Sequence, residues 1–350
     1  MVDVCSMGTD ILQSFSFFFQ RPTQVQLDIT NKCNLNCIYC YNSSNSFYYG
    51  REMDDCTFKG VVSQIISDLR PVFVSFSGGE PLLRKELLLE SISMLKKGRI
   101  EVHINTNALL FDNKLCEFFK KLNVDKININ VESLDANKYD KMRGKKGSYR
   151  ILRKKLELLK SSIGAQKLSI AVVVTKENLH DLLSLATFVK KNNFMELHLL
   201  DMIPTFGNDR TILLTKKEWV EFYKIFNRIK SLGIRIKPNH ALLFLSSFRE
   251  KVFFPFCMAG RLKMVICSNG KVVPCNYFKD PKYVCGDATK EKLLKIWKDS
   301  EVMNRFRYSM KGYESCNSCE FIKGCAGGCK ALALGLRGKA FSPDPYCFLD

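Results

Sequence analysis

The sequence predicts an α/β protein, a partial (β/α)6 barrel followed by a small C-terminal domain rich in cysteine. Three observations predict it. Six β-rich runs are each followed by a helical pattern, three of those runs have a polar second face, and most cysteines fall into two groups. Alternating strands and helices are typical of a parallel sheet with right-handed crossovers.

The six expected strands share a high content of β-branched and aromatic residues. They are Val25–Thr30, Val72–Ser77, Ile100–Asn105, Lys126–Val131, Leu168–Thr175 and Met195–Asp201. The helices expected after them repeat apolar residues at helical spacing. They are Phe58–Leu69, Lys85–Lys96, Lys114–Leu122, Tyr149–Leu159, Leu179–Lys190 and Lys216–Leu232. We therefore expect a barrel over residues 25–236, preceded by an N-terminal segment, 1–24.

The polar second faces indicate that this barrel is open. In one strand, Ile127 and Ile129 alternate with Asn128 and Asn130. The interior of a closed eight-stranded barrel is filled mainly by bulky branched side chains, so a polar face argues against that packing. We expect helices on the apolar faces and a wet cavity along the polar ones. The alternative is that the polar residues simply face solvent.

The region 237–350, which includes a linker, is expected to form the second domain. It offers short strands at Lys263–Cys267 and Lys271–Val273 and one helical pattern, Lys290–Phe306. Little apolar core is expected there, so bound metal should supply much of its folding free energy.

The composition narrows the possible partners and the location. The chain has 350 residues, 46% of them hydrophobic, which excludes intrinsic disorder. No apolar run reaches the roughly 18 residues of a membrane helix and no signal peptide is evident, which predicts a cytoplasmic protein without membrane contact. The formal charge is +19. No basic motif interleaved with aromatic residues accompanies this charge, so nucleic acid is disfavoured as a partner. An acidic peptide and an acidic electron-donor protein suit the basic surface equally well.

The first cysteine group follows the first strand, at the end of the barrel where such enzymes place their sites. It consists of Cys33, Cys37 and Cys40. Zinc or an ordinary iron–sulfur cubane takes four protein ligands, whereas three thiolates leave one metal position open. The loop, with the aromatic Tyr39, resembles the signature of the radical S-adenosylmethionine (SAM) superfamily.

That resemblance implies a set of cofactor contacts. In the superfamily the open iron binds the amino and carboxylate groups of SAM, and the residue matching Tyr39 lies near the adenine. Gly78, Gly79 and Glu80 resemble the Gly-Gly-Glu-Pro motif that contacts the amino group. Asn105, Ser133 and Arg143 resemble polar contacts to the ribose and carboxylate, although Glu132 and Ala136 depart from the usual surroundings.

The second cysteine group resembles the SPASM extension of radical SAM enzymes, so the C-terminal domain is expected to be an iron–sulfur domain. The resemblance implies that Cys316, Cys319, Cys325 and Cys347 hold one auxiliary [4Fe-4S] cluster, and that Cys257, Cys275 and Cys329 hold another. With the SAM cluster this makes three [4Fe-4S] clusters. The fourth ligand of the three-cysteine cluster is Cys267, Cys285 or substrate. A zinc ribbon is the alternative, but it leaves the other cysteines unexplained. The isolated Cys5, Cys56 and Cys116 are expected to be small buried residues.

The resemblance predicts a radical SAM enzyme that reductively cleaves SAM to a 5′-deoxyadenosyl radical and abstracts hydrogen from a substrate. Most SPASM enzymes act on peptides or proteins by crosslinking, oxidation or decarboxylation. The alternatives are modification of a small molecule or tetrapyrrole, as in heme-pathway decarboxylation, and an iron–sulfur electron carrier, which the Gly-Gly-Glu-Pro match opposes.

Several further expectations concern partners and proton transfer. The short segment before the first strand predicts a separate leader-recognition protein, and SAM cleavage needs a ferredoxin- or flavodoxin-type donor.

Asn276 occupies the position where sulfatase-maturing relatives carry an aspartate base. An amide cannot take up a proton at neutral pH, so formylglycine formation is disfavoured. His103, His198, Asp201 and Glu132 are candidates for proton transfer, and no catalytic residue is assigned.

Overall fold

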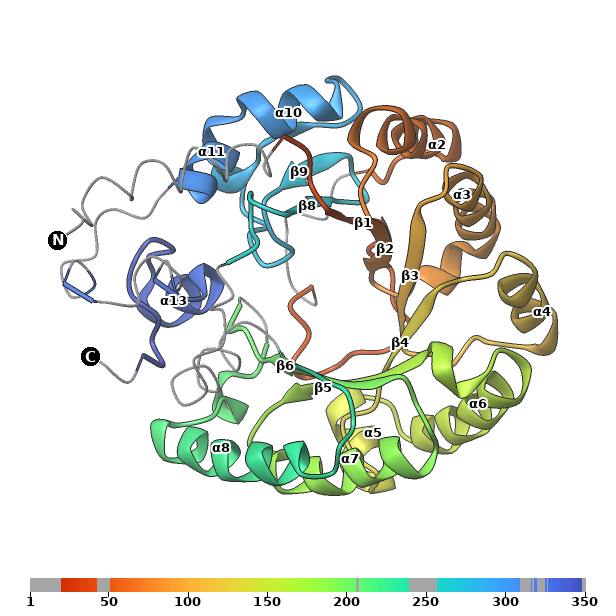
Figure 1. Cartoon of the computed structure of the whole chain (residues 1–350), viewed down its shortest axis with the longest axis vertical. Helices are drawn as coiled ribbons and strands as arrows, with labels where there is room; N and C mark the ends of the chain where they lie inside the picture. Colours follow the sequence, from red (N-terminus) through yellow and green to blue (C-terminus); the bar gives the residue numbers. More distant parts are fainter. Residues whose placement is uncertain are drawn as a thin grey trace, which may run out of the picture.

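A computed structural model describes most of the chain and shows a single curved sheet. It describes residues 20–42, 51–205, 208–238, 257–308, 316, 318–319, 325 and 327–347. The sheet has ten strands in the order β10-β9-β8-β1-β2-β3-β4-β5-β6-β7. It curls around a central space with its helices on the outside (Figure 1). The expected α/β fold with a partial barrel is confirmed.

The strands from β1 to β7 run parallel, and so does the pair β1 and β8. The strands are β1 (Gln24–Thr30), β2 (Phe73–Gly78), β3 (Glu101–Thr106), β4 (Lys126–Asn130), β5 (Leu168–Val174), β6 (Glu196–Asp201), β7 (Ile236–Pro238), β8 (Lys263–Ile266), β9 (Lys271–Val273) and β10 (Gly286–Asp287). The six strands expected for the barrel form within one residue of their expected bounds. β7 and β10 were not expected, because two or three residues carry no periodic signal.

The helices follow the expected pattern with three differences. They are α2 (Asp55–Gln64), which continues as a π-helical turn (Ile65–Leu69), α3 (Lys85–Lys97), α4 (Asn113–Lys121), α5 (Ala136–Arg143), α6 (Ser148–Ser162), α7 (Leu182–Lys191), α8 (Lys216–Lys230), α10 (Leu293–Asp299), α11 (Glu301–Tyr308) and α13 (Lys330–Arg337). The single helix expected over Lys290–Phe306 is wrong: the backbone is extended at Ser300, which separates α10 from α11. The short helices α5 and α13 were missed.

The two faces of the sheet differ as expected. The outward residues of β1, Val25, Leu27 and Ile29, are fully buried in the main hydrophobic core beneath the helices. Met264 and Trp297 from the C-terminal region belong to the same core. The expectation of little apolar core in that region is therefore wrong, because β8 pairs with β1 and extends the barrel sheet.

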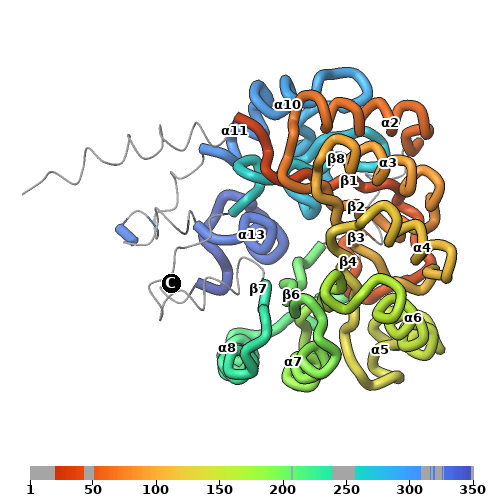
Figure 2. Tube along the Cα trace, turned by 45° about the vertical axis from the view of Figure 1, so that its right-hand side comes forward, coloured from red at the N-terminus to blue at the C-terminus, as the bar shows by residue number. Residues whose placement is uncertain are grey.

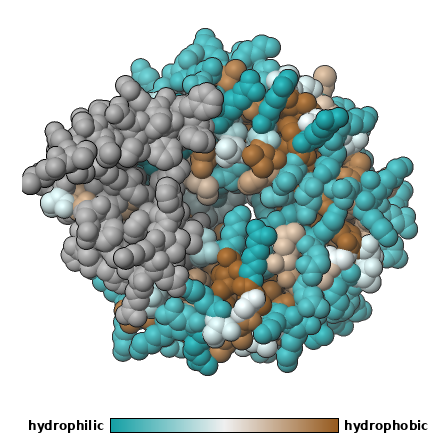
Figure 3. All heavy atoms as spheres, in the orientation of Figure 1, coloured by the Kyte–Doolittle hydropathy of each residue, from teal (hydrophilic) through white to brown (hydrophobic). Residues whose placement is uncertain are grey.

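On the face seen in Figure 3, the coloured part of the surface is largely hydrophilic, and a hollow lies near its centre. In the described part of the chain, no helix is both long enough and apolar enough to cross a membrane.

Candidate active site

The inward strand faces enclose a cavity of about 1350 Å³. Polar residues of neighbouring strands line it, including Gln26, Ser75, Asn105 and Asn128. As expected, the polar residues that alternate with the buried apolar ones line a cavity.

Both cysteine groups reach this cavity. Its lining includes Cys33, Cys37 and Cys40 from the loop after β1, and Cys257, Cys275 and Cys329 from the C-terminal region. The structure thus brings together three cysteines from each group, although more than 200 positions separate the two groups in the sequence.

The loop that carries Cys33, Cys37 and Cys40 is held by backbone contacts. Asn36 N donates to Arg143 O (3.2 Å), and Glu80 N donates to Lys32 O (2.9 Å). A Cβ atom on Gly79 would lie 2.1 Å from Lys32 O, and one on Gly144 would lie 2.1 Å from Asn36 O. Only glycine permits such approaches. The Gly-Gly-Glu-Pro segment and the end of α5 therefore form the cradle of the cysteine loop.

The three thiols of this loop are neighbours. Burial raises the pKa of each thiol, and the charge of a second cysteine of the loop adds to each rise. Cys40 acts on Cys33, Cys33 acts on Cys37, and Cys37 acts on Cys40. Thiolates are the form that binds iron, so a cationic cluster would favour what burial alone disfavours. Among the residues that the structure describes, no three His, Cys, Asp or Glu side chains converge closely enough to hold one metal ion. A cubane binds each thiolate through a different iron and needs a wider ring. The donor set fits an iron–sulfur cluster.

Glu80 is buried at the cavity wall. Its carboxylate accepts hydrogen bonds from Thr106 Oγ1 (2.7 Å), Asn107 N (2.8 Å) and Leu82 N (3.1 Å). Burial raises the pKa of Glu80, and these donors limit the rise. Gly78, Gly79, Glu80 and Asn105 all line the cavity, as do the three cysteines of the loop. The predicted contacts to SAM therefore lie where the cluster would be.

Tyr39 and Arg143 also line the cavity, where they are hydrogen-bonded to each other and share Glu132 as a partner. The Arg143 guanidinium donates to the Tyr39 hydroxyl, which donates to Glu132 Oε1 at 2.5 Å. Burial would lower the pKa of Arg143, yet Glu132 and its neighbours raise it well above its usual value. Arg143 is thus a permanent buried cation, and its carboxylate partner Glu132 lies outside the cavity lining. Of the candidates for proton transfer, His103, His198 and Asp201 line the cavity.

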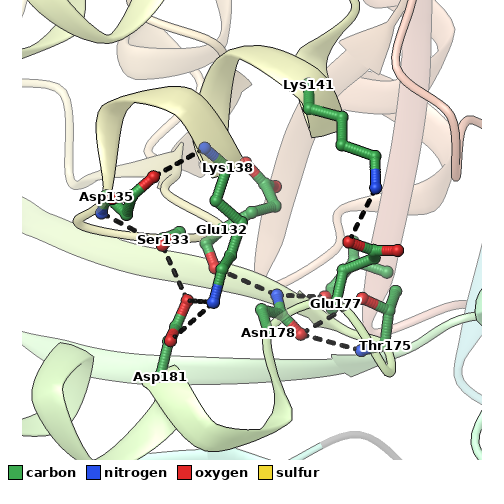
Figure 4. A network of polar contacts seen from close by, with 10 residues as sticks. Glu132, Ser133, Asp135, Lys138, Lys141, Thr175, Glu177, Asn178 and Asp181 are labelled. Carbon is green, nitrogen blue, oxygen red and sulfur yellow. Dashed lines mark hydrogen bonds and ion pairs between the residues drawn. The ribbon is translucent and has the colours of Figure 1, made fainter.

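Ser133 is the one predicted SAM contact that the structure keeps away from the cavity lining. Its hydroxyl donates to Asp181 Oδ2 (2.7 Å), which also pairs with Lys138 Nζ (2.8 Å). Figure 4 shows Ser133 within this polar network. In the same view Asn178 donates to the Glu132 carbonyl (3.0 Å), which ties the ends of β4 and β5 together.

The auxiliary cysteines lie in smaller groups of neighbours. Burial raises the pKa of Cys275 and of Cys329, and the charge of Cys257 adds to the rise in both, so these three are neighbours. Burial also raises the pKa of Cys325 to about 12, with Asp344 and Cys347 contributing. Cys319 N donates to Cys316 O (3.1 Å) within one turn.

Cys267 and Cys285 do not line the cavity that Cys257, Cys275 and Cys329 share. Cys267 is fully buried against Val265 and Val273. Burial raises its pKa well above the usual value, and Asp28 and Cys285 add to the rise. The two candidate fourth ligands are therefore neighbours of each other.

The isolated cysteines behave differently from one another. Cys116 is buried, as expected, whereas Cys56 is exposed because it lies on the outer face of α2. Cys5 lies outside the described residues.

Sequence reasoning missed a link between the two regions. Lys279 Nζ donates to Asp28 Oδ2 (2.8 Å) and to Asn42 Oδ1 (3.0 Å), and Asn42 Nδ2 donates to Gly78 O (2.7 Å). The rings of Tyr41 and Tyr277 meet edge to face with centroids 5.0 Å apart. The C-terminal region thus braces the loop after β1. The sequence around Lys279 gave no sign of this role, because its partners Asp28 and Asn42 lie far away in the chain.

Comparison with known proteins agrees with this arrangement. The family model of the radical SAM superfamily matches residues 27–189, and that of the SPASM iron–sulfur cluster-binding domain matches 257–320. The AdoMet-dependent heme synthase of Methanosarcina barkeri is 23% identical, with 93% of this chain and 96% of that protein covered. The PqqA peptide cyclase of Bradyrhizobium diazoefficiens is 26% identical, with 95% and 87% covered. The solved structure of native anSMEcpe with bound AdoMet is 20% identical, has a TM-score of 0.74 and shares 93% of this chain and 94% of its own. The chain is an enzyme that belongs to the radical SAM superfamily, with a C-terminal SPASM domain that binds iron–sulfur clusters.

Proposed function

We propose that this enzyme abstracts hydrogen from a segment of a peptide or protein held in the central cavity, and so crosslinks, oxidises or decarboxylates it. SAM, bound at a cluster on Cys33, Cys37 and Cys40, supplies the 5′-deoxyadenosyl radical. The observation that carries the proposal is that this loop and Cys257, Cys275 and Cys329 border one cavity. A substrate there would lie between the radical source and an auxiliary cluster able to exchange electrons with it.

Different residues of the chain would bind different parts of SAM. Gly78, Gly79 and Glu80 would receive the amino group of SAM, and Asn105 and Arg143 would receive its polar groups on the other side of the loop. Tyr39 would face the adenine with its ring, because its hydroxyl is already bonded to Glu132. We propose three [4Fe-4S] clusters, of which two are held by the auxiliary cysteine sets described above.

The cavity favours a peptide over a tetrapyrrole, the substrate class of the second candidate function. Its volume of about 1350 Å³ must hold SAM and clusters as well as the substrate, so the chemistry of its wall, and not its size, distinguishes the two classes. Gln24, Gln26, Asn105, Asn128 and Asn130 contribute side-chain amides to its wall. Side-chain amides both donate and accept hydrogen bonds, as a peptide backbone requires. Because one relative is an AdoMet-dependent heme synthase, the tetrapyrrole alternative is included in the test.

The proposal is tested by supplying substrates to the reconstituted enzyme with SAM and dithionite under anaerobic conditions. The candidates are short peptides encoded beside the gene and, as the competing class, an iron porphyrin with propionate groups. We expect one peptide to lose two hydrogens or carbon dioxide in step with 5′-deoxyadenosine formation. The porphyrin should return unchanged, and its modification without any peptide product would overturn the proposal.

The reductant is proposed to be an acidic ferredoxin or flavodoxin that docks beside Cys33. Cys33 is exposed, and Lys145 Nζ lies 3.5 Å from the carbonyl oxygen of Asn34. Lys146 and Arg150 are exposed next to Lys145, at the start of α6. A basic surface beside the cluster loop would steer an acidic donor to it.

Charge reversal should therefore slow the natural donor without affecting a small reductant. We expect the triple variant Lys145→Glu, Lys146→Glu and Arg150→Glu to form 5′-deoxyadenosine at least about tenfold more slowly with flavodoxin at low salt, and at the normal rate with dithionite. Lys216→Glu, Lys217→Glu and Lys224→Glu on α8 form the matched control. Equal flavodoxin rates in the two triple variants would exclude this docking surface.

A further inference from the structure

Two lysines from strands on opposite sides of the barrel face the cavity. Lys237 lies on β7, the edge strand beside β6, and Lys263 lies on β8, which pairs with β1 on the other side of the barrel. Both side chains line the cavity. Figure 2 shows the strands around the opening of the barrel. The two lysines come close enough that the charge of Lys263 lowers the pKa of Lys237, after burial and Lys126. They form what we call the lysine seam.

Two acidic groups lie near the lysine seam: Glu196 raises the pKa of Lys237, and Cys275 lies close enough to Lys263 to feel its charge. The nearby carboxylate of Glu196 is bonded to Lys126 and pairs with Arg235 (3.2 Å). Within the described ranges, neither Lys237 nor Lys263 forms an ion pair with a carboxylate. Lys263 Nζ donates instead to the neutral Asn276 Oδ1 at 2.7 Å.

The remaining titratable groups nearby do not supply the missing charge. Burial, followed by Lys126 and Lys237, lowers the pKa of His103 to about 4. Burial and the three lysines 237, 126 and 263 lower the pKa of His198 well below its usual value. Both imidazoles are therefore neutral at pH 7. The wall therefore carries an excess of positive charge toward the cavity, because Lys126, Lys237 and Lys263 lie near a single carboxylate, that of Glu196, and this excess would attract an anion.

We propose that the lysine seam of Lys237 and Lys263 is a subsite for a carboxylate of the substrate, the side chain of a glutamate or aspartate close to the residue that reacts. The inference rests on the proposed peptide function and narrows its substrate class. Asn276 fits this role: it orients Lys263 without neutralising it, whereas an aspartate at the same place would compete with the substrate carboxylate. The amides of the other walls then remain for the peptide backbone.

The subsite is tested by the binding of two blocked, fluorescently labelled five-residue peptides to the reconstituted enzyme with SAM. The peptides differ only in glutamate or glutamine at the centre. We expect wild type to prefer the glutamate peptide about tenfold, as a partly desolvated charge pair does. Lys237→Gln and Lys263→Gln should each reduce the preference, and the double variant should abolish it. Lys97→Gln, an exposed lysine of α3, is the matched control and should retain it. Iron content and circular dichroism show that the variants are folded.

The outcomes separate this inference from the proposed function. Equal binding of the two peptides to wild type, or a preference that survives in the double variant, overturns the subsite and leaves a peptide substrate intact. A porphyrin tetracarboxylate and its methyl ester form the second arm. If the free acid binds in a lysine-dependent way and neither peptide binds, the carboxylate subsite stands and the peptide function fails.

Discussion

Replacing Cys33, Cys37 and Cys40 together with alanine will abolish 5′-deoxyadenosine formation and leave the auxiliary clusters in place. The three thiols border the cavity next to the Gly-Gly-Glu-Pro segment. Their loop is held by backbone hydrogen bonds that alanine preserves, and the auxiliary cysteines lie on other elements. The variant should lose about four irons per chain. Iron analysis and a 5′-deoxyadenosine assay under dithionite measure both effects.

Cys56→Ala is the matched control, because Cys56 is also an exposed cysteine but lies on α2, away from the cavity lining. It should retain its iron and its activity. A triple variant that still cleaves SAM, or one that loses iron from all clusters at once, would contradict the assignment of the three cysteines.

Replacing Lys279 with methionine should produce a large loss of stability. The side chains of Lys279 and Asp28 are 1% and 0% exposed. Burial lowers the pKa of Lys279, and Asp28 opposes that effect. Removing the cation would leave the buried carboxylate of Asp28 without the Lys279 charge, at a cost of roughly 3–5 kcal/mol in the free energy of unfolding. Urea unfolding of the holoenzyme measures this loss.

The same variant should weaken the SAM cluster. Lys279 holds Asn42, which in turn holds the Gly78 carbonyl, two contacts that brace the segment after Cys40. We expect less iron at Cys33, Cys37 and Cys40, read from the electron paramagnetic resonance signal that changes on addition of SAM. The double variant Asp28→Leu with Lys279→Met should recover part of the stability, because it removes both buried charges.

Lys59 provides the control for the buried pair. Its ion pair with Glu90 is exposed, with 39% and 58% of the two side chains accessible, so Lys59→Met should cost no more than about 1 kcal/mol. If Lys279→Met is as stable as Lys59→Met, the buried ion pair does not join the two regions in the way described.

The site could be predicted from sequence only as far as local pattern extends. The spacing of Cys33, Cys37 and Cys40 and the glycines at 78 and 79 lie within single loops, so their chemistry is visible in the chain order. The position of Ser133 after a strand gave the same kind of signal, yet its hydroxyl is bonded to Asp181. Chain order indicates which strand end a residue occupies, but side-chain direction depends on the neighbours it meets in the folded protein.

The sequence by itself determined the order of the six βα units, the polar inner faces and the division of the cysteines, because these depend on periodicities of two and 3.6 residues and on short spacings. Tertiary structure alone decided that β8 joins β1, that Lys279 pairs with Asp28 251 positions away, and that Lys237 and Lys263 face the same cavity. The physical reason is that strand pairing and buried charge pairs join residues remote in sequence, and the packing of the whole sheet selects these partners.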